Sequence, residues 1–279
     1  MAEITAALVA QLRRQTGAGM MDCKKALVEK SGDYEGAVDL LRKKGQATAD
    51  KKQGAETREG VIPQHVLPSM RVGTLVEVNC QTDFVAKNES FQDFCAEVAR
   101  LLTEDPSADL ESLRVDQVSK IRENIQISRS QRLEVTGIGI VAAYIHTGGK
   151  IGVLVEVGAG QEATLSKDEF RQFVKDITLQ VAAASPLAVT REALDPAVVA
   201  KEKEIAAEQV KGKPEAVVEK IVSGKMEKYF SGVCLLDQGF VKRNSEVSVK
   251  EQLAEVAKGV GDSIEIRRFL RFQLGEALA

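Results

Sequence analysis

An internal duplication is the feature of this sequence that most constrains its fold. The segment VGTLVEV at 72–78 returns as IGVLVEV at 151–157, and FQDF at 91–94 returns as FRQF at 170–173. Both pairs have the same offset of 79 residues (from 72 to 151 and from 91 to 170), so the connection between the two segments has kept its length. Each copy therefore reads as strand, turn, strand and helix.

A second pair of repeated segments shows where the two copies differ in length. ENIQISR at 123–129 pairs with DSIEIRR at 262–268, each a predicted strand preceded by a helix, at an offset of 139 residues (from 123 to 262). The second copy has thus gained about 60 residues between its first helix and its last strand. Gly212 followed by Pro214 predicts the end of one helix and the first position of the next. The added segment is therefore predicted to be an antiparallel helical hairpin.

The apolar residues of this hairpin are spaced as in a coiled-coil pair, with lysine and glutamate on the outer faces. The seam is predicted to contain Val198, Val199, Ile205, Val217, Val218, Ile221 and Val222.

The first 45 or so residues predict three short helices. Asp33 is a plausible N-cap of the third helix, and Gly45 is placed to end it. The polar stretch QATADKKQGAETREG at 46–60 reads as a linker that should share few contacts with the core. A unit of this size has marginal stability on its own.

These patterns predict an α+β fold in which small antiparallel sheets belong to duplicated α/β subdomains. The N-terminal three-helix domain and its linker occupy 1–55, and the first core subdomain occupies 56–137. The second core subdomain is discontinuous, over 138–187 and 231–279, with the hairpin inserted at 188–230.

Composition excludes several classes of protein. No run reaches the roughly 18 apolar residues that cross a bilayer, and the N-terminus has no basic start followed by an apolar stretch. Four scattered cysteines and two histidines argue against a zinc site or a disulfide framework, and fit a reducing cytosol. A net charge of −3 and the absence of tryptophan argue against a dedicated nucleic-acid binder. We expect a soluble protein with no membrane or direct nucleic-acid partner.

A search for catalytic motifs finds little. The sequence has no Gly-x-Ser-x-Gly, phosphate-binding loop or dinucleotide fingerprint, and the glycines of HTGGKIG at 146–152 are typical of a hairpin turn. Cys80 and His146 could form a nucleophile and its base, so an enzyme of unknown type remains an alternative. A buried structural thiol is the simpler interpretation of Cys80, and we expect no enzyme.

The stretch VEVNCQTDFVAKNES at 76–90 places Phe84 in what should be a solvated connection. At the offset of 79, TDFV at 82–85 falls on QEAT at 161–164. A scaffold that needed a large apolar side chain there should show one in both copies. The comparison favours an exposed Phe84 that contacts a partner beside the acidic Asp83. The alternative, in which Phe84 opens the next helix and points into the core, stays open.

Two long motifs resemble a known family. LRRQTGAGMMDCKKAL at 12–27 and EVNCQTDFVAK at 77–87 resemble the signature motifs of the bacterial elongation factor Ts family, the guanine nucleotide exchange factors for elongation factor Tu. The similarity extends over nearly the whole chain. It implies an N-terminal domain like a ubiquitin-associated (UBA) fold, a duplicated core and an inserted hairpin of the dimerisation type. It also implies elongation factor Tu as the partner, a cytoplasmic location, and nucleotide exchange without covalent chemistry or a cofactor.

The resemblance also assigns roles to particular residues. A loop that enters elongation factor Tu near its magnesium site is implied, and it consists of Thr82, Asp83, Phe84 and Val85. Three further partner contacts are implied by matches elsewhere in the chain: Lys24, His146 and Val241.

Two alternatives remain beside the enzyme. The N-terminal three-helix unit could be a general module for ubiquitin-like ligands, which predicts binding by the isolated first 45 residues with the TDFV loop dispensable. The hairpin could mediate a homodimer.

Overall fold

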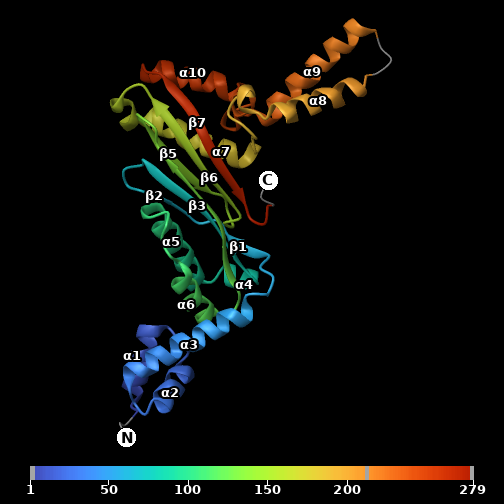
Figure 1. The fold of residues 1–279 in the computed structure, drawn as a ribbon. Helices are drawn as coiled ribbons and strands as arrows, with labels where there is room; N and C mark the ends of the chain where they lie inside the picture. Colours follow the sequence, from blue (N-terminus) through green and yellow to red (C-terminus); the bar gives the residue numbers. More distant parts are fainter. Residues whose placement is uncertain (1–3, 211–213, 277–279) are drawn as a thin grey trace.

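The computed structural model describes residues 4–210 and 214–276. The N-terminal helices lie at one end of an elongated molecule, a layered α/β core follows, and a helical hairpin projects at the other end (Figure 1). Helices and strands are mixed in the core, and both sheets are antiparallel. The predicted α+β fold class is therefore confirmed.

The N-terminal unit contains α1 (Ala6–Thr16), α2 (Met20–Glu29) and α3 (Tyr34–Lys52). Gly17 ends α1 in the left-handed conformation (φ 66°), and its amide donates to the Arg13 carbonyl, as expected for a helix-terminating glycine. The three helices enclose a small core of their own that includes Leu12, Cys23 and Leu27.

The predicted end of the third helix at Gly45 is wrong. Asp33 does stand at the N-cap, but α3 continues through Gly45 to Lys52, so the first part of the expected linker at 46–60 is helical. Gly45 remains in the helix because it packs against α6 (Glu111–Ile121), where an added Cβ would lie only 3.4 Å from Ser119. Tertiary contact with α6 thus overrides the weak helix propensity of glycine.

The first sheet consists of β1 (Glu59–Val61), β2 (Gln64–Val66), β3 (Val72–Cys80) and β4 (Ile125–Glu134). β1 and β2 both pair with one edge of β3, and β4 pairs with the other. The strand that precedes the turn in this copy is divided into β1 and β2, because Pro63 has no amide to donate and the Ile62 amide donates to the Gly149 carbonyl instead of to β3. The helices α5 (Glu89–Glu104) and α6 cover the outer face of this sheet (Figure 1).

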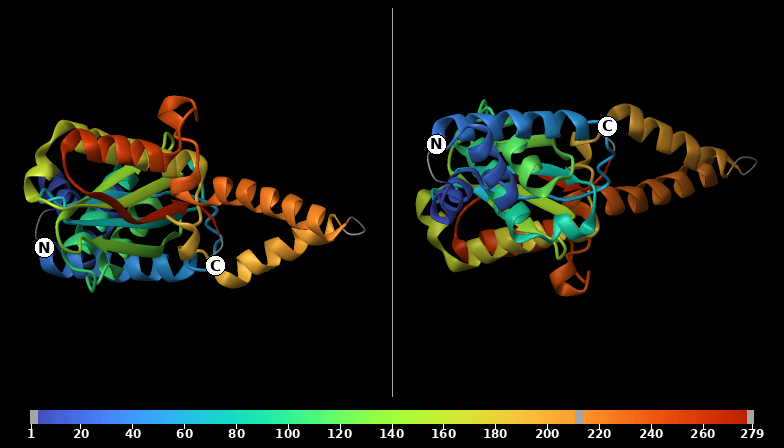
Figure 2. Two further views of the ribbon diagram at one scale, coloured as in Figure 1. Left: turned by 90° about the horizontal axis from the view of Figure 1, so that it is seen from above. Right: turned by 90° about the horizontal axis from the view of Figure 1, so that it is seen from below.

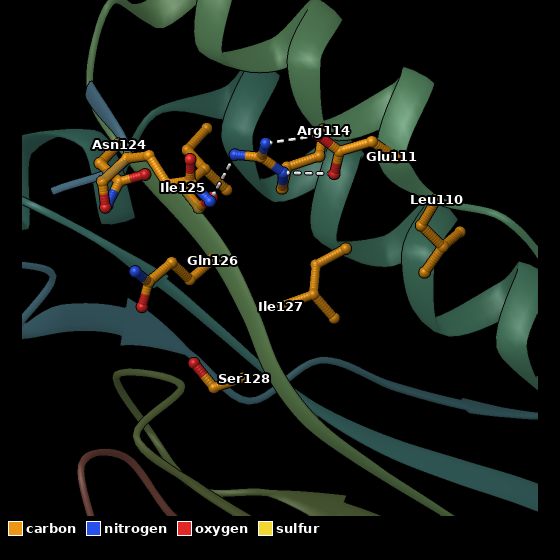
Figure 3. A pocket seen from close by; sticks show the side chains of 9 residues that line it. Leu110, Glu111, Arg114, Asn124, Ile125, Gln126, Ile127 and Ser128 are labelled. Carbon is orange, nitrogen blue, oxygen red and sulfur yellow. Dashed lines mark hydrogen bonds and ion pairs between the residues drawn. The ribbon is translucent and has the colours of Figure 1, made fainter. Parts of the chain in front are cut away.

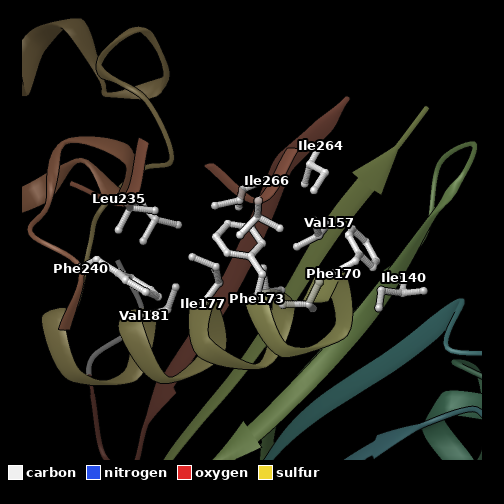
Figure 4. Packing of buried hydrophobic residues seen from close by; sticks show 14 of the residues in the cluster. Ile140, Val157, Phe170, Phe173, Ile177, Val181, Leu235, Phe240, Ile264 and Ile266 are labelled. Atoms are coloured by element: carbon white, nitrogen blue, oxygen red, sulfur yellow. The ribbon is translucent and has the colours of Figure 1, made fainter. Parts of the chain in front are cut away.

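The second sheet has the order β5 (Gly139–Ile145), β6 (Ile151–Ala159) and β7 (Ile264–Gln273). The helices α7 (Asp168–Ala184) and α10 (Val249–Val260) pack on its outer face. Figure 4 shows Phe170, Phe173 and Ile177 of α7 packed against Ile264 and Ile266 of β7.

The duplication predicted from the sequence is confirmed by the strand register. Gly60 pairs with Asn79 in the first sheet, and the equivalent residues Gly139 and Gly158 pair in the second. The register also shifts at the same place in both sheets: Ser128 of β4 is the extra residue opposite Glu77 and Val78, and Arg267 of β7 is the extra residue opposite Glu156 and Val157. The two sheets pack face to face, and their shared core contains Ile62, Leu75, Leu133, Val135, Val141, Leu154 and Phe272.

The inserted hairpin is formed by α8 (Pro196–Glu208) and α9 (Glu215–Val233), which project away from the layers in both views of Figure 2. Gly212 lies outside the described residues. Pro214 is the N-cap of α9, whereas we expected it at the first helical position, and α9 continues past residue 230 to Val233.

The seam of the hairpin also differs in part from the prediction. Four of the predicted residues pack in it with Ala206, Val210 and Met226: Val199, Val218, Ile221 and Val222. The prediction is wrong for Val198, Ile205 and Val217, whose exposed fractions are 44%, 42% and 43%.

Candidate functional site

The TDFV loop is a single turn of helix, α4 (Asp83–Ala86), that directly follows β3. Thr82 is its N-cap, and the Thr82 side chain accepts a hydrogen bond from the Val85 amide at 3.3 Å. Ala86 is buried and Val85 packs partly against the core of the first subdomain. The turn is thus held to the scaffold by its two small apolar residues and its cap.

Phe84 points away from that core and is 83% exposed. No other exposed large hydrophobic residue in the described part of the chain has a larger exposed fraction. In the second subdomain, the equivalent turn is η1 (Glu162–Ser166), where Ala163 stands at the position of Phe84. The alternative in which Phe84 packs into the core is therefore wrong. Its role in binding a partner stays a prediction.

Asp83 lies at the start of the same turn. Its carboxylate accepts a hydrogen bond from Lys87 Nζ at 2.8 Å, one helical turn further on. This hydrogen bond from Lys87 holds the pKa of Asp83 below its ordinary value. Asp83 is therefore a carboxylate at neutral pH, and an ion pair as exposed as this one is easily exchanged for another cation.

A second carboxylate, that of Glu123, anchors the start of the turn. Glu123, at the corner between α6 and β4, accepts hydrogen bonds from the backbone amides of Gln81 and Thr82, both at 3.1 Å. Its other oxygen accepts from the Thr82 hydroxyl at 2.7 Å. We did not select Glu123 from the sequence. The repeated segments ENIQISR and DSIEIRR both begin with an acidic residue, Glu123 and Asp262, and this shared position could have identified Glu123.

Asp83 and His146 line one cleft of about 750 Å³, together with the Gly148–Gly149 turn. That turn, between β5 and β6, is held against the first sheet because the Gly149 carbonyl accepts from the Ile62 amide at 2.7 Å. His146 Nδ1 lies 3.1 Å from the Tyr144 hydroxyl. The structure therefore brings together two predicted partner contacts that are far apart in the sequence.

The other two predicted contacts lie elsewhere. Lys24 is exposed on α2, on the N-terminal unit, where Met20 and Met21 are also exposed. Val241 is partly exposed on η4 (Val241–Arg243), and its amide donates to Gln180 Oε1 of α7 at 2.8 Å. Neither Lys24 nor Val241 is among the described residues that line the cleft.

Cys80 is buried at the end of β3, directly under the turn. Its thiol donates to the Thr82 carbonyl at 3.3 Å. Burial, with a smaller effect of the negative charge on Glu123, raises the pKa of Cys80 to about 12. The thiol is therefore protonated at neutral pH and lacks the thiolate that a nucleophile requires.

A separate groove runs between α6 and the free edge of β4 (Figure 3). Arg114 pairs there with Glu111 and also donates to the Ile125 carbonyl at 3.2 Å. None of the described residues that line this groove was selected from the sequence.

Two further findings concern other kinds of site. Within residues 4–210 and 214–276, no group of three or more histidine, cysteine, aspartate or glutamate residues is arranged to hold a metal ion. In the same described part of the chain, no helix combines the length and apolar character that a membrane span requires.

Comparison with known proteins agrees with the resemblance of the two motifs. The family described as Elongation factor TS matches residues 81–276. The chain is 41% identical to elongation factor Ts of Nautilia profundicola, with 100% of this chain and 95% of the relative aligned. It is 43% identical to the protein of the same name from Symbiobacterium thermophilum, over 100% of this chain and 94% of the relative. It is 41% identical to elongation factor Ts of Lawsonia intracellularis, over 98% of this chain and 99% of the relative.

These matches, together with the fold, define the class: the chain is a translation elongation factor. Within that class, it belongs to the elongation factor Ts family.

Proposed function

We propose that this chain is a guanine nucleotide exchange factor that binds elongation factor Tu, displaces its Mg²⁺ and promotes the release of GDP. The observation that carries the proposal is the exposure of Phe84 on a turn that is fixed to a rigid sheet. A largely exposed aromatic side chain on an ordered element is suited to fill a pocket of a partner.

The energetics require more than one side chain. A nucleotide held with nanomolar affinity is bound by about 12 kcal/mol, whereas burying one phenylalanine side chain contributes only about 1.5–3 kcal/mol. The factor must therefore bind the nucleotide-free partner over a broad surface. Because coupling between two ligands is reciprocal, each then weakens the binding of the other.

Asp83 and Phe84 have separate roles in this proposal. Phe84 separates side chains that pack together in the partner, and the Asp83 carboxylate disturbs the magnesium coordination that holds the phosphates. Thr82 and Val85 hold the turn in place through the cap and the apolar contact described above. The proposed exchange involves no covalent step and no cofactor of its own, and it takes place in the cytoplasm, where elongation occurs.

The remaining contacts would extend the bound surface. Lys24 lies beside exposed Met20 and Met21, so α2 offers both charge and apolar area to the GTP-binding domain of the partner. His146 would contribute from the cleft and Val241 from η4. We also infer that the domains divide as predicted from the sequence, with the N-terminal unit and the two core subdomains each supplying one part of this surface.

The hairpin provides a different surface. The exposed side chains of Val198, Ile205 and Val217 give it apolar area outside its own seam. A homodimer formed through this face is the proposal that they support, and sedimentation equilibrium over a range of concentrations tests it. A monomer at all concentrations would exclude it.

The release of a fluorescent GDP from elongation factor Tu tests the main proposal. The wild-type chain should accelerate release, and Asp83→Ala and Phe84→Ala should each slow the stimulated rate. Leu187→Ala is the matched control, because Leu187 is another exposed large apolar residue (64%) but is not among the proposed contacts. No acceleration by the wild-type chain would overturn the proposal.

A further inference from the structure

The anchoring of the TDFV turn depends on one side chain from a distant part of the chain. The two carboxylate oxygens of Glu123 accept three hydrogen bonds, all from Gln81 and Thr82, at the point where β3 ends and α4 begins. The Thr82 hydroxyl in turn accepts from the Val85 amide. Glu123 thus fixes the start of the segment that carries Phe84 directly, and Thr82 links that start to Val85 at its other end.

The position of Glu123 is itself fixed by its neighbours. Arg122 ends α6 in the left-handed conformation (φ 65°) and forms an ion pair with Asp22 of α2 at 2.6 Å. Asn124 is fully buried, and its side-chain amide donates to the carbonyl groups of Gln53 and Ala55, just beyond α3. The corner between α6 and β4 is therefore held from both sides, and Glu123 is presented to the turn in one place.

The second subdomain has an anchoring carboxylate at the equivalent position, with partly different hydrogen bonds and a different turn. Asp262, the equivalent of Glu123, accepts from the Gln161 amide at 2.9 Å and from the Thr164 hydroxyl at 2.7 Å. Its turn carries Ala163 where the first subdomain carries Phe84. The anchor is thus a property of the duplicated scaffold, and only the first copy combines it with an exposed aromatic side chain.

We propose that Glu123 is a positioning residue for nucleotide exchange, which holds the turn so that Phe84 and Asp83 enter the partner in one orientation. This inference rests on the proposed function. A single helical turn is far too short to be stable alone, since nucleating a helix is unfavourable. Without the anchor, the turn would have to be ordered at the moment of binding, and the cost of ordering weakens the interaction.

The test compares Glu123→Ala with Asp262→Ala in the stimulated release of fluorescent GDP from elongation factor Tu. Each variant removes the equivalent anchor from one copy, so each should lower the melting temperature by a similar amount. Glu123→Ala should reduce the release rate at saturating factor about tenfold per folded molecule, in the range of coupling between residues of one network. Asp262→Ala should stimulate the release of GDP from elongation factor Tu at close to the wild-type rate.

Two more variants distinguish a positioning role of Glu123 from a general loss of stability of the fold. In Glu123→Gln, the side-chain carbonyl oxygen still accepts from the two backbone amides and the side-chain NH2 donates to the Thr82 hydroxyl, so this variant should restore most of the rate. Because Glu123 acts through the turn that carries Phe84, the loss of rate in Glu123→Ala combined with Phe84→Ala should be smaller than the sum of the two single losses. Equal losses in Glu123→Ala and Asp262→Ala, or additive losses in the double variant, would overturn the inference.

The outcomes also distinguish this inference from the proposed function. If Phe84→Ala leaves the release rate unchanged, the function proposed for the turn is wrong. If Phe84→Ala slows release but Glu123→Ala does not, only the positioning role is wrong. Hydrogen exchange of the Thr82 and Val85 amides in the free protein gives a readout without the partner: Glu123→Ala should accelerate it at these amides, and unchanged exchange would contradict the anchor.

Discussion

Gly73 and Gly152 occupy equivalent positions in the two central strands, and each leaves room for a leucine of the opposite sheet. An added Cβ would lie 3.2 Å from Leu154 at Gly73 and 3.1 Å from Leu75 at Gly152. These two leucines are themselves equivalent in the duplication. The same close contact therefore occurs twice across the interface between the sheets, and it keeps the two subdomains in one packed core.

The first prediction concerns this interface. Gly152→Ala should lower the free energy of unfolding by about 1–3 kcal/mol, because the new methyl group would lie 2.5 Å from Ile62 Cγ2. Urea denaturation provides the measurement. Gly224→Ala on α9 is the control: its Cβ meets nothing within 4 Å, so higher helix propensity should leave stability unchanged or raised by up to about 1 kcal/mol. Similar effects of both substitutions would contradict the packing described here.

The second prediction concerns pH. Burial raises the pKa of Glu156, but hydrogen bonds from the Thr136 amide and from Arg268 and Arg267 outweigh it and hold the pKa below its ordinary value. A carboxylate with a lowered folded-state pKa stabilises the fold above its unfolded-state pKa, and this contribution is lost as pH falls through the folded-state value.

Glu156→Gln should therefore cost about 1.5–3 kcal/mol at pH 7, and the difference from wild type should shrink as pH falls below about 4. Glu265→Gln is the control, because Glu265 pairs with Arg267 at the exposed surface, at 3.5 Å, and should have little effect. The measurement is the free energy of unfolding of wild type and Glu156→Gln, from urea denaturation at pH 7 and below about pH 4. A difference between the two proteins that stayed the same at both pH values would contradict this account.

The third prediction concerns the attachment of the N-terminal unit. Ala49 of α3 is buried in the core cluster of the first subdomain, whereas Ala47 is exposed on the same helix. Ala49→Glu should destabilise the protein by at least about 2 kcal/mol, since it places a charge in an apolar contact. Ala47→Glu should change stability by less than about 0.5 kcal/mol. If thermal melting tolerated both variants equally, α3 would not be packed on the core in solution.

The fourth prediction divides the hairpin into two parts. The hairpin cluster contains Ala206, Val210, Val218 and Val222, so replacing residues 202–225 with a short glycine-serine linker should leave the melting temperature of the core almost unchanged. Replacing 188–230 should lower it clearly, because Ala188 is buried with Cys234 and Arg191 pairs with Asp237 at 2.8 Å. Equal melting temperatures for the two deletions would show that the base of the hairpin does not brace the second subdomain.

The duplicated core could be predicted from the sequence because identical spacing in two copies fixes identical register. The offset of 79 residues reappears in the strand pairs Gly60–Asn79 and Gly139–Gly158. The length of α3 could not be predicted, since polar residues at 46–52 and Gly45 locally favour a break. Only the contact with α6, which is remote in the sequence, makes the helix continue.

The site was predictable to the extent that the two copies differ. The contrast between TDFV and QEAT identified Phe84 as a residue that the scaffold does not need, and its exposure agrees. The hairpin residues Val198 and Ile205 were placed wrongly because both faces of a projecting helix pair carry apolar residues, and spacing alone does not decide which face is the seam. Glu123 was missed because a carboxylate that binds backbone amides leaves no periodic pattern.

The most direct test of the central claim measures Phe84→Ala in two ways: the free energy of unfolding, and the rate of stimulated GDP release from elongation factor Tu per folded molecule. Because Phe84 is 83% exposed, unfolding should stay within about 0.5 kcal/mol of wild type, while stimulated release should slow. A loss of about 3–5 kcal/mol in stability, the cost of removing a core phenylalanine, together with a normal release rate, would contradict the account.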